Sequence, residues 1–94
     1  RLYVPKKAAY ISITDNGQIR VSSVGEISVP VPGPEDVLSF AAGVVAMDPT
    51  KEFVLKADRD VPYRHVDRVV DALKQAKART IYLLSQQETV DGTG

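Results

Sequence analysis

The stretch VLKADRDVPYRHVDRVVDALKQAKARTIYLL, from Val54 to Leu84, decides the expected fold. The strand at its start begins one residue earlier, and this strand, Phe53 to Ala57, is apolar apart from one lysine, as a buried strand is. An amphipathic segment follows, and Thr80 to Ser85 is again β-branched and apolar. Two strands that are joined through a helix are normally parallel and cross right-handedly. The stretch therefore predicts a βαβ unit.

The helix of this unit is predicted from its start signals and from the spacing of its apolar residues. Asp58-Arg59-Asp60 indicates a turn, with Asp60 or Val61 as the helix N-cap and Pro62 in the first helical turn. Apolar residues then recur three and four apart, which is the period of a helix with one buried face. The buried face is expected to hold Val66, Val69, Val70, Leu73 and Ala76, and the solvated face Arg64, His65, Asp67, Arg68, Asp71 and Lys74.

The N-terminal part of the chain predicts a β-hairpin. Ala9 to Thr14 and Gln18 to Ser22 both alternate between apolar and polar residues, which is typical of half-buried strands. Asp15-Asn16-Gly17 lies between them, and Asn-Gly favours a type I′ turn with positive φ at both central residues. One face of this hairpin carries Ile11, Ile13, Ile19 and Val21 and needs a cover.

A first helix is expected between Pro34 and Asp48-Pro49. Proline is tolerated in the first helical turn, and the residue before a proline avoids helical backbone angles. Its apolar face holds Val37, Leu38, Ala41, Val44 and Val45, whereas Gly43 weakens the helix. The preceding stretch is ambiguous: Glu26 to Val29 fits a short edge strand or a loop equally well, because Pro30 and Pro32 limit any strand.

The expected element order is therefore β-β-α-β-α-β. Each helix has one apolar face, and so does the hairpin. One mixed sheet with both helices on a single face buries all of them, so the expected fold class is a two-layer α/β (α+β) sandwich. The other face of the sheet would stay open. We expect a flexible lead-in over residues 1–7, the folded domain over 8–85 and a flexible tail over 86–94.

Composition excludes several classes of function. The 94 residues fit one domain, and a net charge of +0 argues against a nucleic-acid-binding domain, which normally has a basic excess. The same net charge argues against strong attraction to an acidic membrane surface. The absence of cysteine excludes disulfides, thiolate zinc sites and a cysteine nucleophile. The longest apolar run, Phe40 to Met47, is too short to span a membrane. Because the chain begins at Arg1 rather than Met, we expect a fragment or a processed chain, with any membrane anchor upstream.

Catalytic and metal sites have little support in the sequence. His65, the single histidine, has no serine or cysteine partner nearby, so an ordinary surface residue is the expected role. Arg59 between the carboxylates of Asp58 and Asp60 works against cation binding there. No glycine-rich nucleotide loop is present. We therefore expect neither an enzyme nor a bound cofactor or metal.

The strand Thr80 to Leu84 is the strongest candidate for an interaction site. It is apolar and uncharged. At the edge of the sheet, such a strand could pair with a partner strand, because an edge leaves backbone groups exposed. A central strand of the same composition would have no such role. The sequence leaves both alternatives open.

The stretch from Phe53 to Leu84 resembles the signature of the ExbD/TolR family of biopolymer transport proteins. The shared pattern is a strand that ends in Ala-Asp, then Val-x-Tyr after two residues, a helix of the form VVDALKQA and an apolar strand. The hairpin YISITDNGQIRV is also similar to the family's first two strands, so the resemblance covers Ala8 to Ser85. The matching positions in the signature are Ala57, Asp58, Val61, Tyr63, Val69, Val70, Asp71, Leu73 and Ala76.

Two features depart from the family pattern. Lys77 stands where the family often has glycine, so the second helix is expected to end without the usual left-handed glycine cap. Ser23 to Gly33 is longer and richer in proline than is typical. The choice between the ExbD and TolR branches therefore stays open.

The resemblance implies the periplasmic domain of a single-pass protein of the bacterial inner membrane. The membrane helix, with its proton-responsive aspartate, would lie outside this sequence. The implied partners are an ExbB/TolQ-like membrane subunit, a TonB/TolA-like transducer and a second copy of the chain, and, in the TolR branch, peptidoglycan. Such complexes couple the proton gradient to work at the outer membrane. The expected role is thus docking and dimerisation in a transport system.

For that role, the expected docking residues are Ile81, Leu83 and Ser85 by strand addition, with Tyr63 and Asp58 shaping the neighbouring turn. The main alternative is a peptidoglycan-binding module that anchors the complex to the cell wall. A third interpretation, a small regulatory domain that binds a ligand, requires a pocket between the sheet and the helices. The sequence shows no polar cluster to line one.

Overall fold

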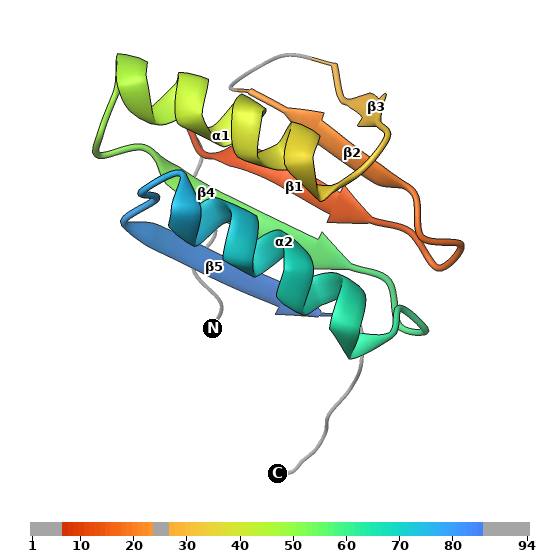
Figure 1. Ribbon diagram of the computed structural model, residues 1–94. Helices are drawn as coiled ribbons and strands as arrows, with labels where there is room; N and C mark the ends of the chain where they lie inside the picture. The colour runs from red at the N-terminus through yellow and green to blue at the C-terminus, as the bar shows by residue number, and fades with distance from the viewer. Residues whose placement is uncertain (1–6, 24–26, 86–94) are drawn as a thin grey trace, which may run out of the picture.

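A computed structural model describes residues 7–23 and 27–85 of the chain (Figure 1). Within these ranges it contains five strands and two helices in the expected alternation. The sequence left a short strand over Glu26 to Val29 undecided, and Glu26 lies outside the described residues. The third strand that is observed shares only Val29 with that stretch and includes Pro30, which was expected to limit a strand. The elements are β1 (Ala9–Ile13), β2 (Ile19–Ser22), β3 (Val29–Val31), α1 (Pro34–Met47), β4 (Glu52–Ala57), α2 (Tyr63–Gln75) and β5 (Thr80–Ser85).

The strands form one mixed sheet in the order β3-β2-β1-β4-β5. The pairs β1–β2 and β2–β3 are antiparallel, whereas β1–β4 and β4–β5 are parallel. Both parallel connections advance in the same direction across the sheet. Right-handed crossovers of this kind put their helices on the same face, and α1 and α2 do lie together on one face (Figure 1). The expected two-layer sandwich is confirmed.

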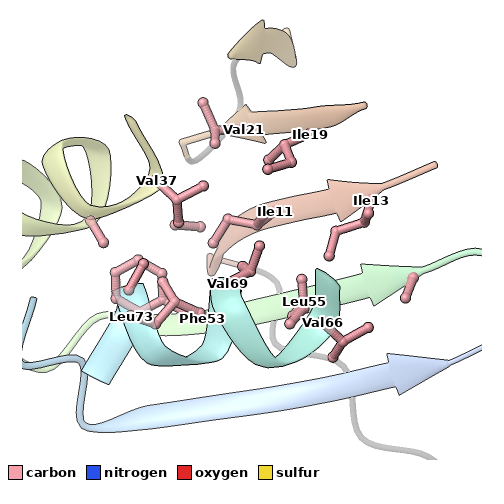
Figure 2. Close-up of a cluster of buried hydrophobic side chains, with 14 of the residues drawn as sticks. Ile11, Ile13, Ile19, Val21, Val37, Phe53, Leu55, Val66, Val69 and Leu73 are labelled. Atoms are coloured by element: carbon pink, nitrogen blue, oxygen red, sulfur yellow. The ribbon is translucent and has the colours of Figure 1, made fainter. Parts of the chain in front are cut away.

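The core lies between the two helices and the face of the sheet that they cover (Figure 2). Val37 of α1 and Val69 and Leu73 of α2 are fully buried against Ile11 of β1 and Phe53 of β4. Burying each such side chain contributes roughly 1.5–3 kcal/mol to folding. In α2 the buried face includes Ala72, whereas Val70, which was expected there, is partly buried. In α1, Val37 and Ala41 are buried as predicted, whereas Leu38, Val44 and Val45 are partly buried against the core.

The hairpin forms where expected, but its turn differs from the type I′ turn that Asn-Gly predicts. Gly17 has a φ of +87°, and Asn16 does not have a positive φ. The N–H of Gly17 donates to the carbonyl of Thr14, and the N–H of Thr14 donates to the carbonyl of Gln18, each at 2.9 Å. This pattern fits a three-residue loop, which needs a left-handed backbone at one position only. The amide oxygen of Asn16 also accepts a hydrogen bond from the N–H of Gln18 at 3.3 Å.

The start of α2 corrects a second expectation. The N-cap is Pro62, with extended backbone angles, and not Asp60 or Val61. The N–H of Val61 donates to the carbonyl of Asp58 at 3.2 Å, which closes a turn over these residues. The side chain of Val61 is buried in the core. Because these two interactions hold the chain in the turn, the helix begins only after the proline.

The end of α2 is left-handed without a glycine. Lys77 has a φ of +72°. Its N–H donates to the carbonyl of Lys74 at 3.0 Å, and the N–H of Ala78 donates to the carbonyl of Leu73 at 3.1 Å. These two bonds define a Schellman motif. The cap geometry usually associated with glycine is therefore present, with lysine in the unfavourable position.

Candidate functional site

Strand β5 lies at the edge of the sheet (Figure 1). It pairs in parallel with β4 over its whole length, from Thr80 opposite Glu52 to Ser85 opposite Ala57. Among the described residues no strand lies on its other side. The structure thus decides between the two alternatives left by the sequence, and the strand is an edge strand rather than a central one.

The two edges of the sheet differ in how well they are protected against pairing. The opposite edge is β3, which has three residues, and its central residue Pro30 has no N–H to donate. Short edge strands and edge prolines prevent association with other strands. Strand β5 has six residues and contains neither proline nor a charged side chain. The edge at β5 is therefore the one that is suited to receive another strand.

Two apolar side chains of β5 lie on the face that the helices cover. Ile81 is opposite Phe53 in register and packs partly against the core. Leu83 is opposite Leu55, but its side chain remains 50% exposed because it lies at the edge of the layer. Tyr63, 74% exposed, is the first residue of α2, which begins at the end of the sheet where β5 ends (Figure 1). We refer to Ile81 and Leu83 as the β5 edge patch, and Tyr63 lies beyond it at the end of the sheet.

Asp58 does not join this patch. Its carboxylate accepts a hydrogen bond from the backbone N–H of Asp15 at 3.2 Å. Asp15 follows β1, which lies on the other side of β4 from β5. The carboxylate therefore ties the end of β4 to the hairpin turn and faces away from the edge. Sequence reasoning missed this contact, since nothing in the local pattern relates two residues 43 positions apart.

The face of the sheet without helices is more covered than expected. Val54 on this face is fully buried, and its register partners Tyr10 and Tyr82 flank it on the neighbouring strands. Both tyrosines are half-buried. The hydroxyl of Tyr82 donates to the carboxylate of Glu52 at 3.3 Å. Aromatic side chains of the neighbouring strands thus account for the burial at the centre of this face.

Several hollows lie at the surface of the described residues. A hollow of about 220 Å³ between the helices is lined by Leu38, Arg68 and Asp71, among others. A second hollow of about 180 Å³ includes half-buried His65 in its wall. A third hollow of about 320 Å³, at the end of α1, includes Met47 and Lys51 in its wall. Ligand pockets normally enclose roughly 300–1,000 Å³, so this hollow reaches the lower limit of that range and the first two fall below it. Over residues 7–23 and 27–85, no group of three acidic or histidine side chains is placed to hold a metal ion.

One carboxyl group has a clearly shifted pKa. The Thr50 hydroxyl and backbone N–H donate to the carboxylate of Asp48 at 2.7 and 3.0 Å, and these bonds lower the pKa of Asp48. Lys51 adds a weaker attraction. Asp48 is the C-cap of α1 and does not belong to the β5 edge patch, so this shift reflects a helix terminus.

Comparison with known proteins matches the chain to one family model. Residues 3–88 match the family model described as "Biopolymer transport protein ExbD/TolR". No curated protein matches the chain. Proteins of this family are generally anchored in the inner membrane; within the described part of this chain, neither helix is long and apolar enough to cross a membrane. The match covers nearly the whole sequence, and the chain belongs to the ExbD/TolR family of biopolymer transport proteins.

Proposed function

We propose that the chain is the periplasmic docking domain of a complex that uses the proton gradient to drive biopolymer transport. In this proposal an upstream membrane helix anchors the domain beside an ExbB/TolQ-like subunit. The domain itself has no catalytic role. It receives an extended segment of a TonB/TolA-like transducer on β5. The observation that carries the proposal is the long, uncharged and proline-free edge at β5, opposite an edge that proline protects.

Strand addition would use both the backbone and the side chains of β5. A partner strand gains main-chain hydrogen bonds along the edge, each with a net contribution of about 0.5–1.5 kcal/mol. Apolar side chains that face the helix layer would also cover Leu83 and the ring of Tyr63. The same edge could pair with β5 of a second copy, which gives a symmetric dimer. Ser85 belongs to this proposal as the last backbone position of the strand.

Leu83→Lys tests the proposal. Because the Leu83 side chain is half exposed, covering the rest of it contributes about 1 kcal/mol. A lysine at this position gives up that free energy of burial, and its charge would have to lose water when the peptide binds. We therefore expect binding of a transducer peptide to weaken at least about ten-fold. The fold should persist, because the substituted side chain lies at the edge of the layer.

Val29→Lys is the matched control. Val29 is 51% exposed, lies on the opposite edge strand and, through its register partner Val21, belongs to the helix-covered face. We expect Val29→Lys to bind the peptide like the parent chain. Equal binding by Leu83→Lys and the parent would overturn docking at β5. If the chain binds cell-wall muropeptides but not transducer peptides, this result would instead favour the wall-anchoring alternative.

A further inference from the structure

The two ends of the sandwich carry opposite charge, although the whole sequence has a net charge of +0. The parallel strands β1, β4 and β5 all start at one end, and both helices end there. Among the described residues, five cations and two anions gather at this end, which we call the basic end: Lys7, Lys51, Lys74, Lys77 and Arg79 against Asp48 and Glu52. The opposite end has Asp15, Glu35, Asp36, Asp58 and Asp60 against Arg59, Arg64 and Arg68, the last of which lines a hollow together with Gly17 and Pro34.

Helix dipoles explain only part of this separation. Cations in the last helical turn and acids in the first turn are favourable in any helix. This accounts for Lys74 and Lys77 at the end of α2. It does not account for Lys7 and Arg79, which lie in the segments that lead into strands. The basic end thus has a net charge of about plus three, more positive than helix stability requires.

The chain leads into the domain at this same end. The ammonium group of Lys51 donates to the backbone carbonyl of Lys7 at 3.2 Å, so the loop before β4 holds the segment that leads into β1. Beside it, Met47 ends α1 with its side chain 89% exposed. A flexible apolar side chain among cations is the combination that favours contact with a charged bilayer surface.

We propose that the basic end lies on a bilayer surface that carries anionic headgroups. The proposal rests on the proposed function in one respect: the membrane anchor is upstream, so the end that receives the incoming chain is the end nearest the membrane. The acidic end then faces away from the lipid, because anionic headgroups would repel its carboxylates. Strand β5 runs from the basic end to the acidic end. Its edge therefore stays accessible along the side of the domain.

The expected interaction is weak by itself and effective when tethered. Each Lys or Arg near an anionic surface strengthens binding by about five-fold at low salt. Three net charges thus give roughly a hundred-fold preference for an anionic over a neutral bilayer, which salt reduces. Tethering raises the effective concentration into the millimolar range, where such affinities suffice. The contact would orient the domain rather than anchor it.

NMR spectroscopy with nanodiscs tests this orientation. The isotope-labelled chain is mixed with nanodiscs of phosphatidylcholine and phosphatidylglycerol that contain a nitroxide-labelled phosphatidylcholine. Relaxation enhancement is then measured for each backbone amide. We expect the largest enhancement at Lys7, Met47 and Lys77 and the smallest at Gly17 in the hairpin turn. Nanodiscs of phosphatidylcholine alone should give little enhancement. Raised salt should reduce the enhancement that the anionic nanodiscs give.

Two charge reversals test whether lipid binding depends on where a charge lies in the domain or only on the net charge of the chain. Arg79→Glu at the basic end and Arg64→Glu at the acidic end change the total charge equally, and both side chains are exposed. Arg79→Glu should weaken binding at least about five-fold, whereas Arg64→Glu should leave it nearly unchanged. Enhancement that is absent, uniform or largest at the hairpin would overturn the proposal, as would equal effects of the two variants. None of these results bears on transducer docking at β5, which is measured without lipid.

Discussion

Replacing Lys77 by glycine should stabilise the domain, because Lys77 occupies a left-handed backbone conformation at the end of α2. Its φ of +72° brings Cβ close to the following carbonyl group. Two hydrogen bonds of the Schellman motif hold it there. Glycine adopts the same conformation without this steric cost. The substitution therefore changes the strain at one residue while the cap itself is kept.

The magnitude follows from three terms. A left-handed conformation costs an ordinary residue about 1–2 kcal/mol. Glycine also gives the unfolded chain more conformational freedom, which offsets about 0.4–1 kcal/mol of the stability gained by removing the strain. Loss of the lysine charge at the helix C-terminus removes roughly 0.3 kcal/mol more. We expect Lys77→Gly to exceed Lys77→Ala in stability by about 1 kcal/mol, and to exceed the parent chain by somewhat less.

Urea unfolding followed by circular dichroism measures these differences. The midpoint should rise for Lys77→Gly while the slope stays constant, which indicates a change in stability alone. In a thermal melt, 1 kcal/mol corresponds to roughly 4–8 °C for a domain of this size. Lys74→Gly, three residues earlier in right-handed helix, is the opposite control and should lose about 1 kcal/mol.

Equal stability of Lys77→Gly and Lys77→Ala would refute the reasoning. It would mean that residue 77 is not held in a left-handed conformation in solution. A loss of stability in both glycine variants would lead to the same conclusion, because glycine would then act as it does inside a helix.

Three further substitutions test the packing and the pKa shift. Gly43→Ala in α1 should gain about 1 kcal/mol in the same unfolding assay, since a Cβ at this position meets nothing within 4 Å; no gain would show that the site is restricted. Leu73→Ala should cost about 2–5 kcal/mol, because the fully buried side chain leaves a cavity; a cost below 1 kcal/mol would contradict its central place in the core. Thr50→Val should raise the pKa of Asp48, as followed by carboxyl NMR. Because the folded-state pKa of Asp48 is lowered from 3.8, its contribution to stability is present above about pH 3.8 and lost as the pH falls through the folded value.

Local signals were sufficient to predict most elements. Pro34 and Asp48-Pro49 delimit α1, and the observed helix has the expected bounds. The alternation in β1 and β2 predicts the hairpin, and the spacing in α2 predicts most of its buried residues. These signals depend on neighbours within a few positions, so a single sequence contains them in full.

The features that the sequence did not predict depend on longer-range or competing interactions. Asn16 favours one type of turn, but its side chain binds Gln18 and the hairpin closes with a longer loop. Lys77 has no intrinsic preference for a left-handed backbone, and the helix cap imposes it. The position of β5 at the edge, on which the candidate site depends, is set by strand order, and local periodicity does not encode strand order.

The most direct test of docking at β5 is an NMR titration of the labelled chain with periplasmic peptides from the TonB- or TolA-like protein of the same organism. Docking at β5 predicts amide shifts concentrated on Thr80 to Ser85 and at Tyr63, with no comparable change on Val29 to Val31. Amide shifts on the β3 edge without shifts on β5 would contradict docking at β5. Saturable binding that leaves the amide shifts of both edges unchanged would contradict it as well.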